Sequence, residues 1–311
     1  MSNIPTLYMM VGLPASGKST EAARMQNENR ELSIHSSDSI RHELYGSEEI
    51  YGDPNKVFHV LHSRVKNDLN QGKSVCIDST NISKKHRIHF LNSLNNISCK
   101  KICVCMMTSY EMCITNNIKR KNIGLRDVPE NVICRMYTNW TPPHESEGFD
   151  RICYKFLKHP QINFVEKFSL MDNFDQMNKH HSLSLGCHCK STCGYVMQAQ
   201  PNDNNLIIAS LLHDVGKLKS VSFKDKKGNI DSNCHYYQHH CIGAYDSVFY
   251  AKSLCLSDFD ISDVSNLIYY HMHPYNEWKY SSRCRQRHLN LLGEEFMSRV
   301  MLLHEADKTA H

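Results

Sequence analysis

The chain of 311 residues is longer than one hydrophobic core usually serves, so we expect two domains of roughly 150 residues each. Its 41% hydrophobic and 22% charged residues are typical of a globular protein, and no apolar run approaches the ~18 residues of a transmembrane helix. The formal net charge of +4 at pH 7 permits a partner that carries phosphate but is too small to demand a nucleic acid.

Strand-like and helix-like runs alternate through the first half of the chain. Apolar runs at residues 6–11, 32–34, 73–77 and 101–107 predict buried strands. Apolar side chains three and four residues apart between positions 57 and 69 predict an amphipathic helix. This alternation favours an α/β domain with a parallel sheet, which binds ligands at the carboxyl ends of its strands.

A complete phosphate-binding loop follows the first strand. Residues 12–20 read Gly-Leu-Pro-Ala-Ser-Gly-Lys-Ser-Thr, which fits G-x-x-x-x-G-K-[ST] and predicts a nucleoside triphosphate site. In such a loop, backbone N–H groups point at phosphate oxygens, the lysine meets the β- and γ-phosphates, and the first hydroxyl after it holds Mg²⁺. The residues expected to bind ATP and Mg²⁺ are Gly12, Ala15, Ser16, Gly17, Lys18, Ser19 and Thr20.

Acidic and basic side chains follow the next two strands. Asp38 and Arg41 stand three residues apart at a predicted helix start, and Asp78 follows the strand at 73–77. Each aspartate alone could be a helix N-cap. Beside a phosphate loop, a carboxylate that takes a proton from an attacking hydroxyl and a guanidinium that holds the acceptor suit Asp38 and Arg41. We also expect Asp78 to contribute to the nucleotide site.

A short basic stretch at residues 117–129 contains Arg120, Gly124 and Arg126 and ends in Val-Pro. It is equally well a solvated loop or a mobile lid whose arginines close over the transferring phosphoryl group.

The order and spacing of these pieces over roughly residues 5–154 resemble the kinase domain of polynucleotide 5′-hydroxyl kinases of the bacteriophage type. This resemblance implies that Lys18 and Ser19 hold the phosphates and Mg²⁺. It further implies that Asp38 is the general base and that Arg41 contacts the phosphate next to the attacked sugar.

The same resemblance implies that Arg126 stabilises the transition state, with Arg120 as a second lid arginine. The spacing of the two differs slightly from that in the phage enzyme, so either can be the catalytic one. Kinases of small metabolites share this scaffold, and a kinase of a metabolite or mononucleotide is the alternative interpretation.

Helical patterns without strand-like alternation begin near residue 161. The predicted domains are therefore a P-loop kinase-like domain at 1–160, a connector at 161–176 and an all-α domain at 177–311. His213 and Asp214 lie side by side on an apolar helix pattern, where burial would be unfavourable without a cation. Imidazole and carboxylate ligands favour Mn²⁺, Fe²⁺, Ni²⁺ or Mg²⁺ over structural zinc.

The second half resembles the HD-domain metal-dependent phosphohydrolases, which are all-helical. Five short sequence segments, in the same order along the chain, carry this resemblance. The pieces are His180-His181-Ser-Leu-Ser-Leu-Gly-Cys-His188, Leu-Leu-His213-Asp214-Val-Gly-Lys217, Tyr-Gln-His239-His240-Cys-Ile-Gly-Ala, Tyr-Tyr-His271-Met-His-Pro and Glu-Ala-Asp307-Lys.

The resemblance implies a first metal bound by His188, His213, Asp214 and Asp307. It also implies that His239 and His271 bind a second metal or the substrate phosphate, and that Lys217 lies close to the scissile phosphate. His240 is adjacent to His239, and a helix could present either. One or two ions would activate water and hold phosphate oxygens during hydrolysis of a phosphoester.

Fourteen cysteines are spread along the chain, many of them in apolar runs where they are expected to be small buried hydrophobes. We found no signal peptide, so we expect free thiols in a reducing, cytoplasmic compartment. The cluster of Cys187, Cys189 and Cys193 lacks a second ligand pair at zinc-finger spacing, which disfavours a structural zinc there.

Taken together, the two halves predict a bifunctional enzyme that heals nucleic-acid ends. The kinase would add phosphate to a 5′-hydroxyl, and the phosphoesterase would remove a 3′-phosphate or a 2′,3′-cyclic phosphate. RNA is favoured over DNA because cyclic phosphates arise only on RNA. The alternatives are a kinase and phosphatase of small molecules and a nucleotide-binding regulator without catalysis. Arg283, Arg285 and Arg287 form either an exposed basic loop or part of a nucleic-acid track.

Overall fold

A computed structural model describes residues 4–50, 52–177 and 182–310. The chain forms two compact units. The first runs to Tyr137 and resumes at Pro143–Lys158, and the second comprises Thr138–Pro142 and continues from His159. His180 and His181 of the HD-like pattern lie outside the described residues. No helix among the described residues is long and apolar enough to cross a membrane.

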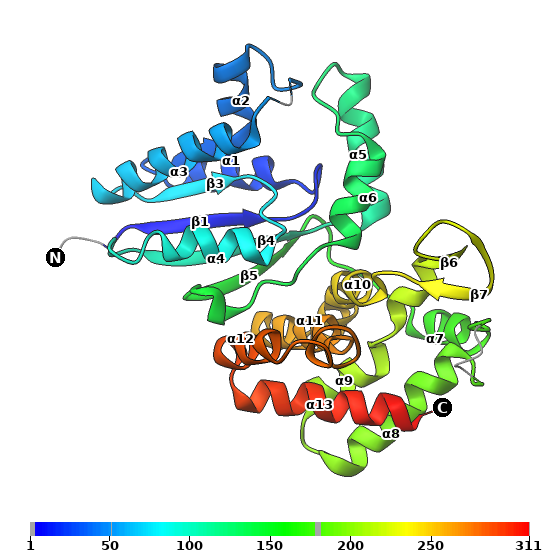
Figure 1. The fold of residues 1–311 in the computed structure, drawn as a ribbon. Coiled ribbons are helices and arrows are strands. Elements are labelled where there is room, and N and C mark those ends of the chain that lie inside the picture. Colours follow the sequence, from blue (N-terminus) through cyan, green and yellow to red (C-terminus); the bar gives the residue numbers. More distant parts are fainter. Residues whose placement is uncertain (1–3, 51, 178–181, 311) are drawn as a thin grey trace. The chain divides into compact units, whose positions relative to one another are not determined.

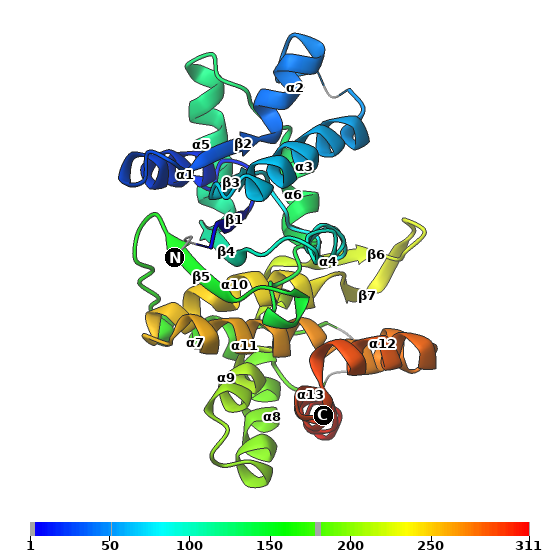
Figure 2. The ribbon, with the colours of Figure 1, turned by 90° about the vertical axis from the view of Figure 1, so that its left-hand side faces the viewer.

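The first unit contains a five-stranded sheet in the order β2-β3-β1-β4-β5, with every neighbouring pair parallel. Helices flank both faces of the sheet (Figures 1 and 2). The α/β class with a parallel sheet is therefore confirmed. The strands are β1 (Thr6–Val11), β2 (Ser33–Ser36), β3 (Val75–Asp78), β4 (Lys100–Met107) and β5 (Arg151–Phe156). The helices are α1 (Lys18–Glu28), α2 (Ser37–Tyr45), α3 (Pro54–Asn70), α4 (Lys84–Asn92), α5 (Tyr110–Asn122), α6 (Glu130–Thr138) and the 3-10 turn η1 (Glu145–Glu147).

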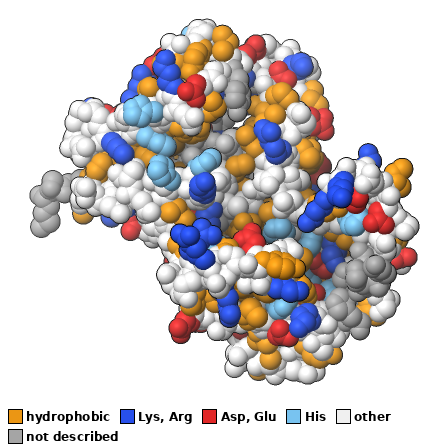
Figure 3. All heavy atoms as spheres, in the orientation of Figure 1, with side chains coloured by type: hydrophobic (Ala, Val, Ile, Leu, Met, Phe, Trp, Pro, Cys, Tyr) orange, Lys and Arg blue, Asp and Glu red, His pale blue; other side chains and the backbone are white. Residues whose placement is uncertain are grey.

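The central strands are buried on both sides, which explains why they read as continuous apolar runs rather than as alternating patterns. Met10 of β1, Cys76 of β3 and Val104 of β4 pack in one cluster with Ala22 of α1 and Leu32. Parallel register aligns Ser36 of β2 with Asp78 of β3, so the loops that follow these strands begin at the same edge of the sheet. Histidine side chains gather on this unit over α3 and α4 (Figure 3).

The second unit is mainly helical, which agrees with the predicted class. It also carries an antiparallel hairpin of β6 (Val221–Lys224) and β7 (Ile230–Tyr236), which the all-α expectation did not include. The helices are α7 (Phe164–Asp172), α8 (Leu185–Ala199), α9 (Asn204–Leu212), η2 (Val215–Lys219), α10 (His239–Ser253), α11 (Asp258–Tyr270), η3 (Pro274–Trp278), α12 (Ser282–Leu292) and α13 (Glu294–Thr309). The segment 161–176, expected to be a connector, contains α7, and Met171 of this helix is fully buried.

Candidate active sites

The phosphate loop connects β1 to α1 in the conformation that its glycines allow. Gly17 has φ +95°, and a side chain there would meet Leu157 at 2.9 Å. A Cβ at Gly12 would lie 2.7 Å from the carbonyl oxygen of Met106, so the backbone can approach β4 only with glycine at this position. Ala15 also has positive φ, at 58°. The loop therefore presents backbone rather than side chains.

The side chain of Lys18 turns back toward the phosphate loop that precedes it. Its Nζ donates to the carbonyl oxygens of Leu13 at 2.7 Å and Gly12 at 3.1 Å. Burial lowers the pKa of this ammonium, although the negative charge of Asp78 opposes that shift. The cation is thus held at the mouth of a backbone loop by weak neutral acceptors, which phosphate oxygens would replace with charged ones.

Three buried polar atoms in the first unit, on Ser16 of the loop and on two residues that follow other strands, have no hydrogen-bond partner among the described residues. They are Ser16 Oγ, Ser79 Oγ and Arg41 Nε. Buried donors are normally satisfied, so unsatisfied ones need an explanation. Ser16 belongs to the phosphate loop, where a bound triphosphate would supply acceptors, so this residue fits a bound nucleotide. Ser19 and Thr20, at the exposed start of α1, are available from solvent, where a metal and a phosphate would enter.

Asp38 is held by two arginines that come from different elements. The side chain of Ser36 caps α2 by accepting from the N–H of Asp38 at 3.2 Å. Arg41 Nη1 donates to Asp38 Oδ1 at 2.6 Å, and Arg126 Nη1 donates to the same oxygen. Arg126 lies 88 positions along the chain, in the loop between α5 and α6. The structure therefore brings together a carboxylate and two guanidinium groups that the sequence had only suggested.

The charges of Arg120 and Asp78 both influence Lys18, whose pKa burial lowers most. Arg120, in the last turn of α5, lowers the pKa of Lys18, whereas Asp78, only 8% exposed at the end of β3, raises it. Arg126, in the loop after α5, contacts Asp38 directly.

Two features of this unit had no clear signal in the sequence. Asn117 fixes the end of the loop after α5, because its side chain accepts from the N–H of Val128 at 2.9 Å and donates to the carbonyl of the same residue at 2.8 Å. Arg87 and Glu147 form a two-point ion pair, with both side chains at 0% exposure. A glutamate 60 residues away in sequence is no local signal for an arginine on a short helix.

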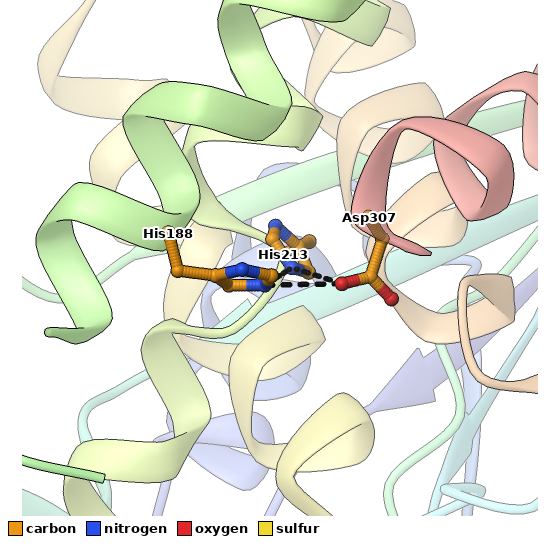
Figure 4. Close-up of side chains that lie close together, drawn as sticks. All are labelled: His188, His213 and Asp307. Atoms are coloured by element: carbon orange, nitrogen blue, oxygen red, sulfur yellow. Dashed lines mark hydrogen bonds and ion pairs between the residues drawn. The ribbon is translucent and has the colours of Figure 1, made fainter. Parts of the chain in front are cut away.

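In the second unit, His188, His213 and Asp307 converge from three helical segments (Figure 4). His188 Nε2 lies 3.3 Å from His213 Nε2 and 3.0 Å from Asp307 Oδ1. His188 comes from α8 and Asp307 from α13. His213 caps the end of α9 instead of lying within it, and Asp214 follows outside the helix, which corrects the expectation of a doublet on one helix.

A second group of donor atoms consists of Asp214, His239 and His271. The two carboxylate oxygens of Asp214 face different groups. Oδ2 lies 3.5 Å from His188 Nε2 and 3.4 Å from His213 Nε2, whereas Oδ1 lies 3.2 Å from His239 Nε2 and 3.7 Å from His271 Nε2. Asp214 therefore bridges the two groups.

Backbone carbonyls orient all four imidazoles. The Nδ1 atoms of His188, His213, His239 and His271 lie 3.3, 2.8, 2.8 and 2.6 Å from the carbonyl oxygens of Ala310, Ser210, Tyr236 and Ile268, respectively. A carbonyl can only accept, so each Nδ1 carries a proton and each Nε2 points toward the carboxylates, where it can ligate a metal ion once it is deprotonated. Paired lone pairs about 3 Å apart repel unless a cation lies between them. These residues therefore fit metal binding.

The charges in this cluster explain its pKa shifts. Burial acts to lower the pKa of His213, but Asp214 and the nearby acidic groups outweigh it and raise that pKa well above its usual range. Burial acts to raise the pKa of Asp214, but the positive charges of Lys217 and His213 hold it well below its usual value. Lys217 Nζ lies 2.6 Å from Asp214 Oδ2. The cluster thus favours bound positive charge.

Gly216 explains why the turn after Asp214 can approach α10. A Cβ at this position would lie 2.0 Å from the carbonyl oxygen of His239, so only glycine allows this packing. The approach places His239, and not its neighbour His240, in the group with Asp214. Instead, His240 packs against Tyr269, and burial lowers its pKa to about 2. Of the two open alternatives, His239 is the one that the geometry supports.

Sequence reasoning missed two residues that contact this cluster. Gln176 Oε1 accepts from Lys217 Nζ at 2.8 Å, and Tyr275 OH donates to Asp307 Oδ2 at 3.1 Å. Neither residue belongs to a recurring spacing, and only the tertiary contact reveals them. All fourteen cysteines are free thiols, and none belongs to a group of metal-binding side chains found among the described residues.

Comparison with known families finds one match in each half of the chain. Residues 7–143 match the model of an AAA domain, and residues 179–311 match that of an HD domain. The chain joins a P-loop kinase-like domain to an HD domain. These two families indicate a kinase and a metal-dependent hydrolase. No curated protein matches the chain in sequence.

Several solved structures match part of the chain, each with a TM-score below 0.5. A chain of the Pnkp1/Rnl/Hen1 RNA repair complex matches with 19% identity and a TM-score of 0.40, over 45% of this chain and 45% of its own length. A fungal RNA kinase matches with 14% identity and a TM-score of 0.37, over 55% of this chain and 87% of its own. Kti12 from Chaetomium thermophilum, in complex with ADP-AlF3, matches with 16% identity and a TM-score of 0.43, over 50% and 91%. The present chain thus spans less than half the length of the RNA repair chain.

Proposed function

We propose that this chain repairs broken nucleic-acid ends, phosphorylating a 5′-hydroxyl with its P-loop unit and hydrolysing a 3′-phosphate or 2′,3′-cyclic phosphate with its HD unit. The observation that carries the proposal is the pair of sites in one chain. One holds Asp38 between two arginines, and the other holds Asp214 between two pairs of histidines. One site would add phosphate and the other would remove it, and together they produce ends that a ligase can join.

In the kinase unit, we assign the triphosphate to the loop from Gly12 to Thr20, with Lys18 at the β- and γ-phosphates. Mg²⁺ held at Ser19 would neutralise charge on the phosphates when bound. Asp38 would accept the proton of the attacking hydroxyl, and Arg41 would hold the acceptor. The Arg126 guanidinium competes for the same carboxylate oxygen, so this arginine has to leave Asp38 and turn to the phosphates as the lid closes.

In the HD unit, we assign one metal to His188, His213, Asp214 and Asp307 and a second metal or the substrate phosphate to His239 and His271, with Asp214 shared. Bound Mn²⁺, Ni²⁺ or Fe²⁺ would supply Lewis acidity and lower the pKa of water. Lys217, already within 2.6 Å of Asp214, would neutralise phosphate charge. The carbonyls that accept from the Nδ1 atoms keep the four rings in place through the reaction.

RNA is the substrate that we favour over DNA, because only RNA forms a 2′,3′-cyclic phosphate. The chain would act in the cytoplasm, where free cysteines persist. A kinase and phosphatase of mononucleotides is the competing hypothesis, and the experiment must separate the two.

The test of the kinase assignment is transfer of label from γ-labelled ATP. We expect label on a 5′-hydroxyl RNA oligonucleotide, and less on DNA or on a 3′-mononucleotide. Asp38→Ala should abolish this labelling, while Glu31→Ala, an exposed residue before β2, should leave it unchanged. Transfer to the mononucleotide alone would replace the end-repair proposal with the small-molecule one.

The phosphoesterase assignment is tested with an RNA that ends in a 3′-phosphate or a 2′,3′-cyclic phosphate. We expect release of the terminal phosphate to depend on Mn²⁺ or Ni²⁺ and to be lost in His213→Ala. Labelling of 5′ ends should survive in the same variant. Metal-dependent release that persists in this variant would remove the assignment of the HD site.

A further inference from the structure

A third cluster of metal-binding side chains lies in the helical unit and shares no residue with the groups around Asp214. His273, Glu277 and His288 each offer one donor atom, and these three atoms lie within 4.8 Å of one another. His273 immediately precedes the π-helical turn η3, which contains Glu277, and His288 lies in α12. No role proposed above uses any of these side chains.

A thiol stands next to this cluster. Cys284 lies in α12 one helical turn before His288, so the two side chains share a face of the helix. Cys284 Sγ donates to Glu277 Oε2 at 3.3 Å. With metal distances of about 2.3 Å to sulfur and about 2.0 Å to oxygen, two ligands of a tetrahedral zinc ion lie about 3.5 Å apart. This separation fits two ligands of one ion. Cys284 Sγ is outside the group whose donor atoms all lie within 4.8 Å of one another, so the thiol has to move toward the imidazoles to complete the site.

The ordinary explanation is an aromatic cluster in which the imidazoles only fill space. His273 does pack against Tyr270 at 4.5 Å and His288 at 5.3 Å between ring centroids. Such packing does not account for a carboxylate and a thiol beside the rings. The donors also occur in the spacing His-x₃-Glu and Cys-x₃-His, and η3 is a π-helical turn, a rare element that frequently marks functional sites.

We propose that His273, Glu277, His288 and Cys284 bind a divalent cation of the zinc class, which ties η3 to α12. Imidazole and thiolate ligands select such an ion over Mg²⁺. Four protein ligands leave no position for substrate, so the site is structural. It lies two residues after His271, and the ion therefore stabilises the segment that carries this residue of the HD site.

The indole of Trp278 provides a signal for metal binding at this site. Its Nε1–H donates to His288 Nδ1 at 2.8 Å. A metal ion at Nδ1 takes the lone pair that accepts this hydrogen bond. A metal ion at Nε2 requires the proton on Nδ1, which also ends the bond. Binding through either nitrogen therefore changes the environment of the Trp278 indole.

The experiment uses the full chain with Trp140→Phe, which leaves Trp278 as the single tryptophan of the two in the sequence. The test variant adds Glu277→Gln and Cys284→Ser. The matched control adds Glu295→Gln and Cys255→Ser, which change one exposed glutamate and one exposed cysteine elsewhere in the unit. Each protein is stripped with chelator and then titrated with Zn²⁺ and, separately, with Co²⁺.

We expect the control to bind one Zn²⁺ ion per chain more than the test variant, as counted by elemental analysis after gel filtration. Its Trp278 emission should shift with Zn²⁺, and its Co²⁺ complex should show a thiolate charge-transfer band. The test variant should lack both signals while its HD site still binds metal. Equal ion counts together with unchanged Trp278 emission would overturn the proposal. Glu277 is exposed, so Glu277→Gln alone gives the same comparison if the double change prevents folding.

Discussion

Asp38 and Asp214 are the candidate carboxylates of the two units, and the chain neutralises them in different ways. Asp38 is 36% exposed at its side chain and receives positive charge from Arg41 and Arg126, which belong to the protein. Asp214 is 4% exposed and faces four imidazoles and one lysine. Protein side chains therefore already supply the positive charge at Asp38, whereas most of the groups that face Asp214 are imidazoles, which can bind metal ions.

The largest effect should come from Asp214→Asn, which keeps the shape of the bridging residue and removes its charge. We expect phosphoesterase activity to fall by at least ~10³-fold, because a metal ion supplies several kcal/mol of stabilisation to the reaction. Metal content should fall together with activity, while 5′ labelling persists. A variant that keeps its metal ions and more than about a tenth of its activity would show that Asp214 is not the bridge between the two groups.

The corresponding change in the first unit, Asp38→Asn, should reduce kcat for 5′ phosphorylation by ~10²- to 10⁴-fold, the range expected for loss of a general base. Affinity for ATP should change little, since Lys18 and the loop remain. Measurement of kcat and of nucleotide binding on the same preparation separates the two effects. Loss of nucleotide binding with unchanged kcat would contradict the role of Asp38.

The first unit also contains a buried ion pair that, unlike the metal site, is complete without a ligand. Arg87→Leu leaves Glu147 charged and fully buried, so we expect the free energy of unfolding to fall by about 3–5 kcal/mol. Arg24→Leu breaks an exposed pair with Glu21 and should lower the free energy of unfolding much less. Denaturant unfolding of both variants gives the comparison. Equal losses would mean that burial of the Arg87 pair has no effect on stability.

The smallest effect is the pH dependence that His62 contributes in the first unit. Burial, followed by the charges of Lys66 and nearby histidines, lowers the pKa of His62 from 6.5 to about 4. The unfolded chain therefore binds a proton that the folded chain excludes, and stability should fall as pH drops from about 6.5 toward 4. His62→Phe should flatten this part of the curve and retain the stacking on Phe90. Unchanged slopes in unfolding experiments at several pH values would exclude His62 as the source.

The contrast between the units also explains which parts of the two sites could be predicted from the sequence. The phosphate loop was predictable because its glycines, lysine and hydroxyls act within nine consecutive residues. The individual metal-binding residues of the HD site were predictable only because five short sequence segments occur in the same order as in HD-domain proteins. Their placement at helix ends, with Asp214 outside α9, depends on the close approach of Gly216 to α10.

Contacts between distant segments were not predictable. Nothing local pairs Asp38 with Arg126 or Arg87 with Glu147. The hairpin of β6 and β7 was missed because its two strands are mostly exposed or half-buried, so neither forms the apolar run that predicts a buried strand. Packing of Thr138–Pro142 with the second unit likewise has no sequence signal, although Trp140 is fully buried there.

The most direct test of two separate phosphate chemistries uses one RNA that carries a 5′-hydroxyl and a 2′,3′-cyclic phosphate. Both ends are followed in the same reaction with the wild type, Asp38→Asn and Asp214→Asn. We predict that the wild type processes both ends, that Asp38→Asn fails only at the 5′ end, and that Asp214→Asn fails only at the 3′ end. Loss of both activities in either variant, or an intact substrate with the wild type, would contradict the account.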